Sequence, residues 1–192
     1  MQWFRTIFNI STLKFVKSSS NLHLVKLTMA ESRFIEVKAP RRIDIKAPSV
    51  FLAGSIEMGK ARPWQDELAK MLSDLDVVVL NPRREDWNKE WKQDSEFKPF
   101  KEQVDWEMDH LEAADVIALY FQPGTMSPIS LLELGLYAAS KKVIVCCPDG
   151  FWRRGNIQIV CMRYGLEIVE TFDELADKVR QKLQEHIQAR KV

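Results

Sequence analysis

Glu133 is the one charged side chain in an otherwise apolar stretch that runs from residue 130 to residue 139. A helix that is apolar on every side is a buried helix, so the sequence predicts a buried helix with a carboxylate inside it. Holding a carboxylate there costs several kcal/mol unless partners or a ligand compensate its charge. Glu133 is therefore a candidate reactive group. The alternative is a structural glutamate that the dipole of the helix amino terminus stabilises.

Glu107 is a second carboxylate that is predicted to face inward. Residues 100–114 form a predicted helix with one apolar stripe, made of Phe100, Val104, Met108, Leu111 and Ala114. Glu107 falls inside that stripe, because it lies three residues after Val104 and four before Leu111. The alternative role for Glu107 is an internal salt bridge to Arg83 or Arg84.

Two inward carboxylates in one crevice are what glycosyl transfer requires. One carboxylate attacks the anomeric carbon, while other groups position the sugar and manage the proton on the leaving group. Like charges held close together also push their pKa values apart, which divides the acid and base roles. The pair Glu107 and Glu133 therefore predicts chemistry at an anomeric carbon.

Strands and helices alternate from Ser49 onward, which favours a parallel sheet covered on both faces. We expect a three-layer, doubly wound α/β fold of the flavodoxin-like type, with a mostly parallel five-stranded sheet. The predicted strands are residues 50–53, 77–80, 116–121, 143–147 and 167–169. The predicted helices are residues 64–72, 100–114, the helix of Glu133, 156–163 and a terminal helix capped by Thr171. Such sheets bind ligands at the carboxyl ends of their strands.

Two loops at the expected carboxyl ends carry candidate binding groups. The turn Gly54-Ser55-Ile56 follows the first strand, and its glycine lets a ligand approach the backbone closely. A simple tight turn explains this segment equally well. Ser127 is a predicted N-cap, with Pro128 at the first position of the Glu133 helix.

The polar loop after the second strand is rich in tryptophan and runs from residue 83 to about residue 99. Asp86 and Trp87 in this loop are suited to hydrogen-bond and stack on a base. The alternative is that its tryptophans pack against the sheet edge or against a partner subunit. Both interpretations remain open at this point.

Composition excludes several functional classes. With 192 residues, of which 46% are hydrophobic, the chain is long enough for one domain with a core. The net charge is +1, from 28 basic and 27 acidic residues, so neither nucleic acid nor a membrane is an expected partner. No apolar run reaches the roughly 18 residues of a membrane span. The cysteines and histidines lack metal-ligand spacing, so no metal and no cofactor is expected.

Residues 1–29 differ from the remainder and are predicted to be a leader, either a transit peptide or a disordered segment. The first 28 residues contain no acidic residue, and their four basic ones are Arg5, Lys14, Lys17 and Lys26. This pattern is typical of a mitochondrial transit peptide, whereas translation from Met29 would give a cytoplasmic protein. Residues 30–48 are expected to be an extended lead-in, and residues 49–192 the folded domain.

Several segments together resemble the nucleoside 2-deoxyribosyltransferase superfamily, and most closely its deoxyribosyltransferase-like branch. They are Val50 to Ile56, Asn81-Pro82-Arg83-Arg84, Trp106-Glu107 with Ala114-Asp115, and Ser127-Pro128 through Glu133-Leu134-Gly135. The resemblance covers roughly residues 49–170, which is nearly the whole expected domain.

The resemblance implies a role for each candidate residue. Glu133 resembles the nucleophile that forms a glycosyl-enzyme intermediate with C1′ of deoxyribose. Glu107 stands where the family places an acidic residue, usually Asp, that contacts the sugar or base. Ser127 and the backbone of residues 54–56 resemble the part that holds the 5′ end of the sugar. Asn156 resembles an asparagine that reaches the nucleophile from a neighbouring subunit, which implies a homodimer or a higher homo-oligomer.

Three residues depart from the family pattern. Many relatives have tyrosine at the position of Phe51, where its hydroxyl can bond the nucleophile. Relatives that hydrolyse nucleotides follow Gly-Ser-Ile with arginine, which suits a 5′-phosphate, whereas Glu57 would repel one. Glutamate in place of aspartate at position 107 lengthens that side chain by one methylene. A nucleoside is therefore favoured over a nucleotide, unless a nearby basic residue supplies the missing charge: Lys60, Arg62 or Arg84.

The expected function is that of an N-glycosidic enzyme that acts on a small-molecule nucleoside. It would cleave or transfer the (deoxy)ribosyl group by retaining double displacement, and a transferase and a hydrolase share this intermediate. Because a fold alone does not confer function, two alternatives stay open. One is a non-catalytic nucleoside or nucleotide sensor on the same scaffold, which Phe51 and Glu57 favour. The other is a 5′-nucleotide N-glycosidase.

Overall fold

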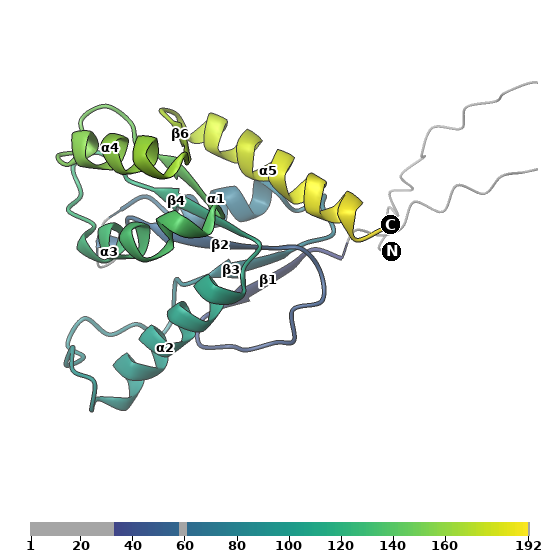
Figure 1. Cartoon of the computed structure of the whole chain (residues 1–192). Coiled ribbons are helices and arrows are strands. Elements are labelled where there is room, and N and C mark those ends of the chain that lie inside the picture. Colours follow the sequence, from purple (N-terminus) through teal and green to yellow (C-terminus); the bar gives the residue numbers. More distant parts are fainter. Residues whose placement is uncertain (1–32, 58–60, 192) are drawn as a thin grey trace, which may run out of the picture. The chain divides into compact units, whose positions relative to one another are not determined.

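Six parallel strands form the centre of the structure, a computed structural model that describes residues 33–57 and 61–191 (Figure 1). Their order across the sheet is β1-β3-β2-β4-β5-β6, and every neighbouring pair is parallel. The strands are β1 (Ile35–Lys38), β2 (Ser49–Gly54), β3 (Val78–Asn81), β4 (Val116–Tyr120), β5 (Val143–Cys146) and β6 (Glu167–Val169). The predicted leader, residues 1–29, lies outside the described residues.

β1 is the one strand that the sequence does not predict. It lies within residues 30–48, for which only an extended lead-in is expected, and it makes the sheet six-stranded instead of five-stranded. β1 pairs with β3, so that Ile35 lies opposite Val78 and Lys38 opposite Asn81. Only Val37 of this edge strand is buried, and four residues with one buried side chain give too weak an apolar signal.

Helices cover both faces of the sheet, as the flavodoxin-like prediction requires (Figure 1). They are α1 (Trp64–Met71), α2 (Lys98–Ala113), α3 (Pro128–Tyr137), α4 (Arg154–Tyr164) and α5 (Phe172–Ala189), with a 3₁₀ turn, η2 (Ala138–Ser140), after α3. Side chains from α2, α3 and α4 pack on one face and those from α1 and α5 on the other. Successive strand residues serve the two faces alternately: Phe51 joins the first cluster and Leu52 the second.

Local signals fix the ends of the last two helices. Thr171 accepts a hydrogen bond from the backbone N–H of Glu174, and the Glu174 side chain accepts one from the backbone N–H of Thr171. This capping box satisfies two donors that a helix amino terminus otherwise leaves free, which confirms the expected start of α5. Gly165 ends α4 in the left-handed conformation, with a φ of 60°.

The prediction of an entirely buried helix around Glu133 is wrong. Only Ser130, Leu134 and Tyr137 of α3 are buried. The outer side of α3 is apolar and exposed, with fractional exposures of 60% for Ile129, 58% for Leu132 and 54% for Leu136. An exposed apolar surface of this kind is typical of a protein–protein contact rather than of a core.

The predicted apolar stripe of α2 is also partly wrong, because Val104 and Met108 are 36% and 45% exposed. The residues that α2 buries are Gln103, Trp106, His110 and Leu111. The Trp106 ring decides this rotation: its Nε1–H donates to the carbonyl of Arg41 at 2.7 Å, and it stacks on His110 with 4.1 Å between ring centroids. Gln103 and Glu107 then lie on the inner side of the helix.

Candidate active site

Glu133 occupies the second turn of α3 and is half-buried. Removal of its carboxyl group from water raises the pKa to about 8, and the nearby charge of Glu107 contributes to the shift. Among the described residues, no side chain or backbone group donates a hydrogen bond to it. Glu133 is therefore a desolvated carboxyl group without a structural partner. A glutamate that caps the helix would instead accept hydrogen bonds from the backbone at the helix amino terminus.

Glu107 lies on the inner side of α2 and is also half-buried. Burial raises its pKa, and a hydrogen bond from Gln103 Nε2 to Glu107 Oε1, at 2.9 Å, opposes that rise. The alternative of an internal salt bridge finds no support in the described contacts. Arg83 donates to a backbone carbonyl, and Arg84 pairs with two other carboxylates.

α2, which carries Glu107, and α3, which carries Glu133, pack on the same face of the sheet (Figure 1). The two carboxyl groups are close enough for Glu107 to raise the pKa of Glu133. One turn further along α3, the Tyr137 hydroxyl donates to the carbonyl of Met108 at 3.5 Å and so connects the two helices. Two buried carboxyl groups whose charges interact titrate at different pH values, which suits one acidic and one nucleophilic role.

The raised pKa of Glu133 makes stability depend on pH. Between pH 4.5 and about 8 the folded protein keeps a proton that the unfolded chain has lost, so this group's contribution to stability falls as pH rises. Glu133→Gln removes the titration. We expect its Tm to match that of the wild type near pH 5 and to exceed it increasingly towards pH 9. Thermal unfolding across this range measures the difference, and a difference that does not change with pH would contradict the assignment.

Three buried hydroxyl groups meet where β2 ends and the loop before α3 begins. Ser55 Oγ lies 2.8 Å from Thr125 Oγ1 and 2.6 Å from Ser127 Oγ, and the last two are 2.9 Å apart. Ser127 precedes α3 in the left-handed conformation, with a φ of 46° and no side-chain cap. Ser127 is the N-cap residue of α3 and Pro128 begins the helix, as predicted, but the Ser127 hydroxyl binds this cluster and makes no capping hydrogen bond.

Glu57 reaches the same loop. Its Oε1 accepts hydrogen bonds from the backbone N–H groups of Met126, at 2.6 Å, and Ser127, at 3.0 Å. The chain thus places its own carboxylate at the amino terminus of α3, where partial positive charge favours an anion. Sequence reasoning identified the charge of Glu57 but not this contact, which joins residues 69 and 70 positions apart.

Gly54 ends β2 with a φ of 139°, a conformation that other residues rarely adopt. Its neighbour Ser55 donates a backbone hydrogen bond to the carbonyl of Tyr120 at 2.9 Å. A Cβ at position 54 would lie 2.3 Å from that same oxygen. The glycine therefore permits close contact between β2 and the end of β4, and Ile56 follows it half-buried.

The tryptophan-rich loop after β3 binds mainly to itself. Arg84 Nε donates to Asp86 Oδ1 at 2.6 Å, which holds the pKa of Asp86 below its ordinary value. The Arg84 guanidinium also lies 5.0 Å from the ring centre of Trp91. Trp87 meets Trp91 edge-on at 5.2 Å and keeps an exposed side. These contacts favour packing within the loop for Trp91, and base contact by Asp86 and Trp87 stays a prediction.

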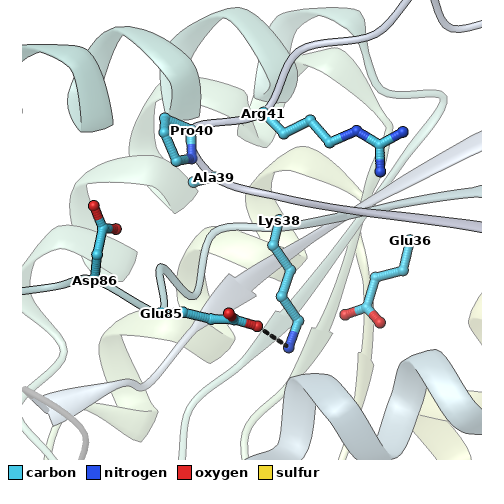
Figure 2. Close-up of a pocket in the computed structure, with 7 residues that line it drawn as sticks. All are labelled: Glu36, Lys38, Ala39, Pro40, Arg41, Glu85 and Asp86. Carbon is cyan, nitrogen blue, oxygen red and sulfur yellow. Dashed lines mark ion pairs between the residues drawn. The ribbon is translucent and has the colours of Figure 1, made fainter.

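Asp86 also lines a cavity of about 480 Å³ at the β1 edge of the sheet (Figure 2). The other lining residues are Glu36, Lys38, Ala39, Pro40, Arg41 and Glu85. Lys38 Nζ lies 3.8 Å from Glu85 Oε1 in this cavity, an ion pair that Figure 2 marks. Neither Glu107 nor Glu133 is among the residues that line it, so the cavity does not coincide with the carboxylate pair.

Asn156 is exposed on the first turn of α4, and its predicted contact with another subunit stays a prediction. The three cysteines are free and buried, and burial raises their pKa values. Within residues 33–57 and 61–191, no group of His, Cys, Asp or Glu side chains is arranged to hold a metal ion. The helices described are all too short or too polar to cross a membrane.

A family model described as "Nucleoside 2-deoxyribosyltransferase like" matches residues 47–151, which is more than half of the chain. The chain belongs to this family. The matched residues of this nucleoside 2-deoxyribosyltransferase-like chain run from the start of β2 to the loop after β5. They include both Glu107 and Glu133, whereas Asn156 lies beyond them. None of the curated proteins compared matches the chain.

One solved structure similar to this nucleoside 2-deoxyribosyltransferase-like chain is the crystal structure of a conserved protein from Enterococcus faecalis V583. The TM-score is 0.50 and the sequences are 12% identical. The similarity covers 71% of this chain and 99% of the other. At this identity the likeness concerns the fold alone, and it supports the flavodoxin-like arrangement that the sequence predicts.

Proposed function

We propose that this protein cleaves or transfers the (deoxy)ribosyl group of a nucleoside by retaining double displacement. The observation that supports the proposal is the position of Glu107 and Glu133 on neighbouring helices of one sheet face, where burial raises the pKa of both, in a nucleoside 2-deoxyribosyltransferase-like chain. Among the described residues, Glu133 makes no hydrogen bond that would give its carboxyl group a structural role.

In the proposed reaction, ionised Glu133 attacks C1′ and the bond from C1′ to the base nitrogen breaks. The departing base takes a proton from Glu107, and an ester joins Glu133 to the sugar. A water molecule or a second base then attacks C1′, returns a proton to Glu107 and releases the glutamate. Two inversions retain the configuration at C1′. Because Glu133 keeps its proton up to a pH of about 8 in the free protein, attack requires the ionised fraction.

The test uses purified protein with a panel of deoxynucleosides and ribonucleosides, each with and without a second free base. Chromatography follows the release of base, which reports hydrolysis, and the formation of a new nucleoside, which reports transfer. Release or exchange that retains the β configuration supports the proposal. Absence of both reactions with every nucleoside of the panel would overturn it.

Glu57 favours a nucleoside over a 5′-nucleotide as substrate. Its carboxylate occupies two backbone N–H donors beside the hydroxyl group of Ser127, the residue proposed to hold the 5′ end of the sugar. A phosphate would meet a like charge, which costs several kcal/mol, and each 1.4 kcal/mol is a tenfold change. Glu57→Gln keeps an acceptor oxygen and removes the charge. We expect it to lower the kcat/KM preference for nucleoside over 5′-monophosphate by about tenfold or more.

The matched control is Glu185→Gln, which removes an exposed carboxylate on α5. It is expected to leave the preference unchanged. Equal ratios in the wild type and Glu57→Gln would contradict the role of Glu57. A wild-type preference for the 5′-monophosphate would favour the nucleotide N-glycosidase instead.

A non-catalytic nucleoside sensor is the second candidate, because Phe51 offers no hydroxyl group to Glu133. Its ring is fully buried and lies 6.0 Å from that of Trp106, between centroids. The sensor hypothesis expects nucleosides to raise the Tm without being consumed. A ligand present at 100 times its Kd adds about 2.7 kcal/mol of stability. Thermal shift and turnover measured on the same samples separate the two functions.

We also propose that the active unit is a homodimer or a higher homo-oligomer. Ile129, Leu132 and Leu136 form an exposed apolar stripe on the helix that carries Glu133, and exposed apolar patches on soluble proteins commonly mark interfaces. Asn156 is the residue proposed to reach a neighbouring subunit's Glu133. Sedimentation equilibrium measures the mass directly, and a monomer at micromolar concentrations would contradict the proposal.

A further inference from the structure

Gln103 is a buried polar side chain that directly contacts one of the two carboxyl groups. It lies on the inner side of α2, one turn before Glu107, and is 4% exposed. Its Nε2 donates to Glu107 Oε1 at 2.9 Å and to the carbonyl of Pro82, after β3, also at 2.9 Å. Both amide protons are therefore used, one to fix the side chain to the end of a strand and the other to hold Glu107.

The other end of the same amide has no partner. Gln103 Oε1 is buried, and no group among the described residues donates a hydrogen bond to it. The orientation of the amide is not interchangeable, because the Pro82 carbonyl only accepts hydrogen bonds and must face the NH₂ end. A buried acceptor without a donor is costly, by roughly 1–3 kcal/mol, so this atom calls for an explanation.

The explanation lies in the chemistry of the carboxyl group beside it. An ionised carboxylate only accepts hydrogen bonds, and it takes the N–H of Gln103 that the structure contains. A protonated carboxyl group has one O–H donor, and an amide can then accept that proton on its oxygen while donating its N–H to the other carboxyl oxygen. Gln103 offers both halves of this pairing, and the half without a partner is the one that a protonated Glu107 completes.

We propose that Gln103 is a positioning residue that holds Glu107 in both of its protonation states. The inference deepens the proposed function, on which its catalytic meaning rests. In that function Glu107 gives a proton to the departing base and takes one back, and Gln103 keeps Glu107 in place during both steps. Without Gln103, a change in protonation would leave Glu107 free to rotate. With it, the carboxyl group gains one hydrogen bond as it gains a proton and stays in place.

The electrostatic surroundings place the proton of the pair on Glu133 in the free protein, so that proton must pass to Glu107 before Glu133 attacks C1′. Gln103 lowers the pKa of Glu107 against the effect of burial, whereas Glu133 has no such donor among the described residues. The charge of Glu107 raises the pKa of Glu133, and the charge of Glu133 in turn raises the pKa of Tyr137, which lies on the same helix, α3. Among the described residues, no basic side chain contributes to the pKa shift of Glu107 or of Glu133.

A nuclear magnetic resonance titration tests the inference without requiring turnover. In wild-type protein with labelled glutamate carboxyl and glutamine amide groups, the Gln103 NH₂ resonances are expected to shift with the same midpoint pH as the Glu107 carboxyl carbon. In Gln103→Met, which keeps the length but removes donor and acceptor, the Glu107 midpoint is expected to rise, because the charge-assisted hydrogen bond to ionised Glu107 outweighs the neutral bonds to protonated Glu107. The bonds lost by the protonated form offset part of this effect, so the expected rise is up to about one pH unit.

The matched control is Gln65→Met on α1, since Gln65 is fully buried, lacks side-chain partners among the described residues and packs on the other face of the sheet. It is expected to leave the Glu107 midpoint unchanged. The wild-type titration stands alone should Gln103→Met fail to fold. Gln103 resonances that do not shift when Glu107 titrates would overturn the inference. So would an unchanged Glu107 midpoint pH in folded Gln103→Met.

Turnover separates this inference from the proposed function. If nucleosides are consumed, the pH limb of kcat that reports Glu107 is expected to move in Gln103→Met by the same amount as the titration midpoint. Turnover with an unmoved pH limb would overturn the role of Gln103 and leave the proposed function intact. Coupled titration of Gln103 and Glu107 without any turnover would overturn the proposed function and leave the hold on Glu107 intact.

Discussion

Glu133→Gln is expected to lose base release and base exchange by about four orders of magnitude or more, the scale seen when a covalent nucleophile is removed. A neutral amide has no charge with which to attack C1′ and cannot form the ester intermediate. Because glutamine has nearly the same shape, the fold and nucleoside binding are expected to survive. Initial rates of base release, measured at saturating nucleoside, give the loss in kcat.

The matched control is Glu185→Gln, which changes an exposed carboxylate on α5, across the sheet from Glu133. Its rates are expected to equal those of the wild type. Wild-type rates in Glu133→Gln would remove Glu133 as the nucleophile. Mass spectrometry of wild-type protein quenched during turnover adds a direct measurement, because the proposed ester increases the mass by one sugar residue.

Gly54→Ala is expected to destabilise the protein by about 3 kcal/mol or more, among the largest effects for a single substitution. The added Cβ would lie 2.3 Å from the carbonyl oxygen and 2.8 Å from the nitrogen of Tyr120. Both atoms belong to the backbone of β4, which pairs with β2 and cannot move without breaking the centre of the sheet. The expected result is a Tm lower by about 6 °C or more, measured by calorimetry.

Gly135→Ala is the control for Gly54→Ala. A Cβ at position 135 meets nothing within 4 Å, and the residue lies within α3. Alanine costs less conformational entropy than glycine in a helix, so this variant is expected to gain about 0.5–1 kcal/mol. A Gly54→Ala protein as stable as the wild type would show that β2 and β4 approach each other less closely than described here.

Alternation of apolar runs with helical periodicity was sufficient to predict the architecture. The four strands β2 to β5 are buried and mainly apolar, which is the pattern of a parallel sheet covered on both faces. β1 has a different character, since Glu36 and Lys38 alternate with Ile35 and Val37 at an edge. Its position depends on pairing with β3, a contact across more than 40 residues that no local window contains.

Helix orientation was harder to predict than helix position. On α2, counting apolar residue types predicted that Val104 and Met108 face the sheet. The tertiary contacts of Trp106 instead rotate α2 so that Gln103 and His110 face the sheet. On α3, an apolar side does not distinguish a core from an interface, because both exclude water. The structure separates the two by showing which of these side chains meet the sheet.

The candidate site was predictable where a charge broke an apolar pattern, as at Glu133 and Glu107. Gln103, Thr125 and the contact made by Glu57 were not predictable in this way, because polar residues in a helix or loop are ordinary. Their meaning comes from partners distant in sequence, such as Pro82 for Gln103 and Met126 for Glu57. No local signal in the sequence points to these pairings.

The two faces of the sheet, each with its own apolar cluster, differ in the candidate residues that they carry. The candidate residues lie on α2, α3, α4, at the end of β2 and on the loops that follow β2, β3 and β4, whereas α1 and α5 carry none of them. The α1–α5 layer is therefore available for engineering. Exposed positions of this layer suit thermostabilising substitutions, attachment to a surface or a fluorescent label, whereas Trp64 of α1 must stay, because its Nε1–H donates to the carbonyl of Ser55.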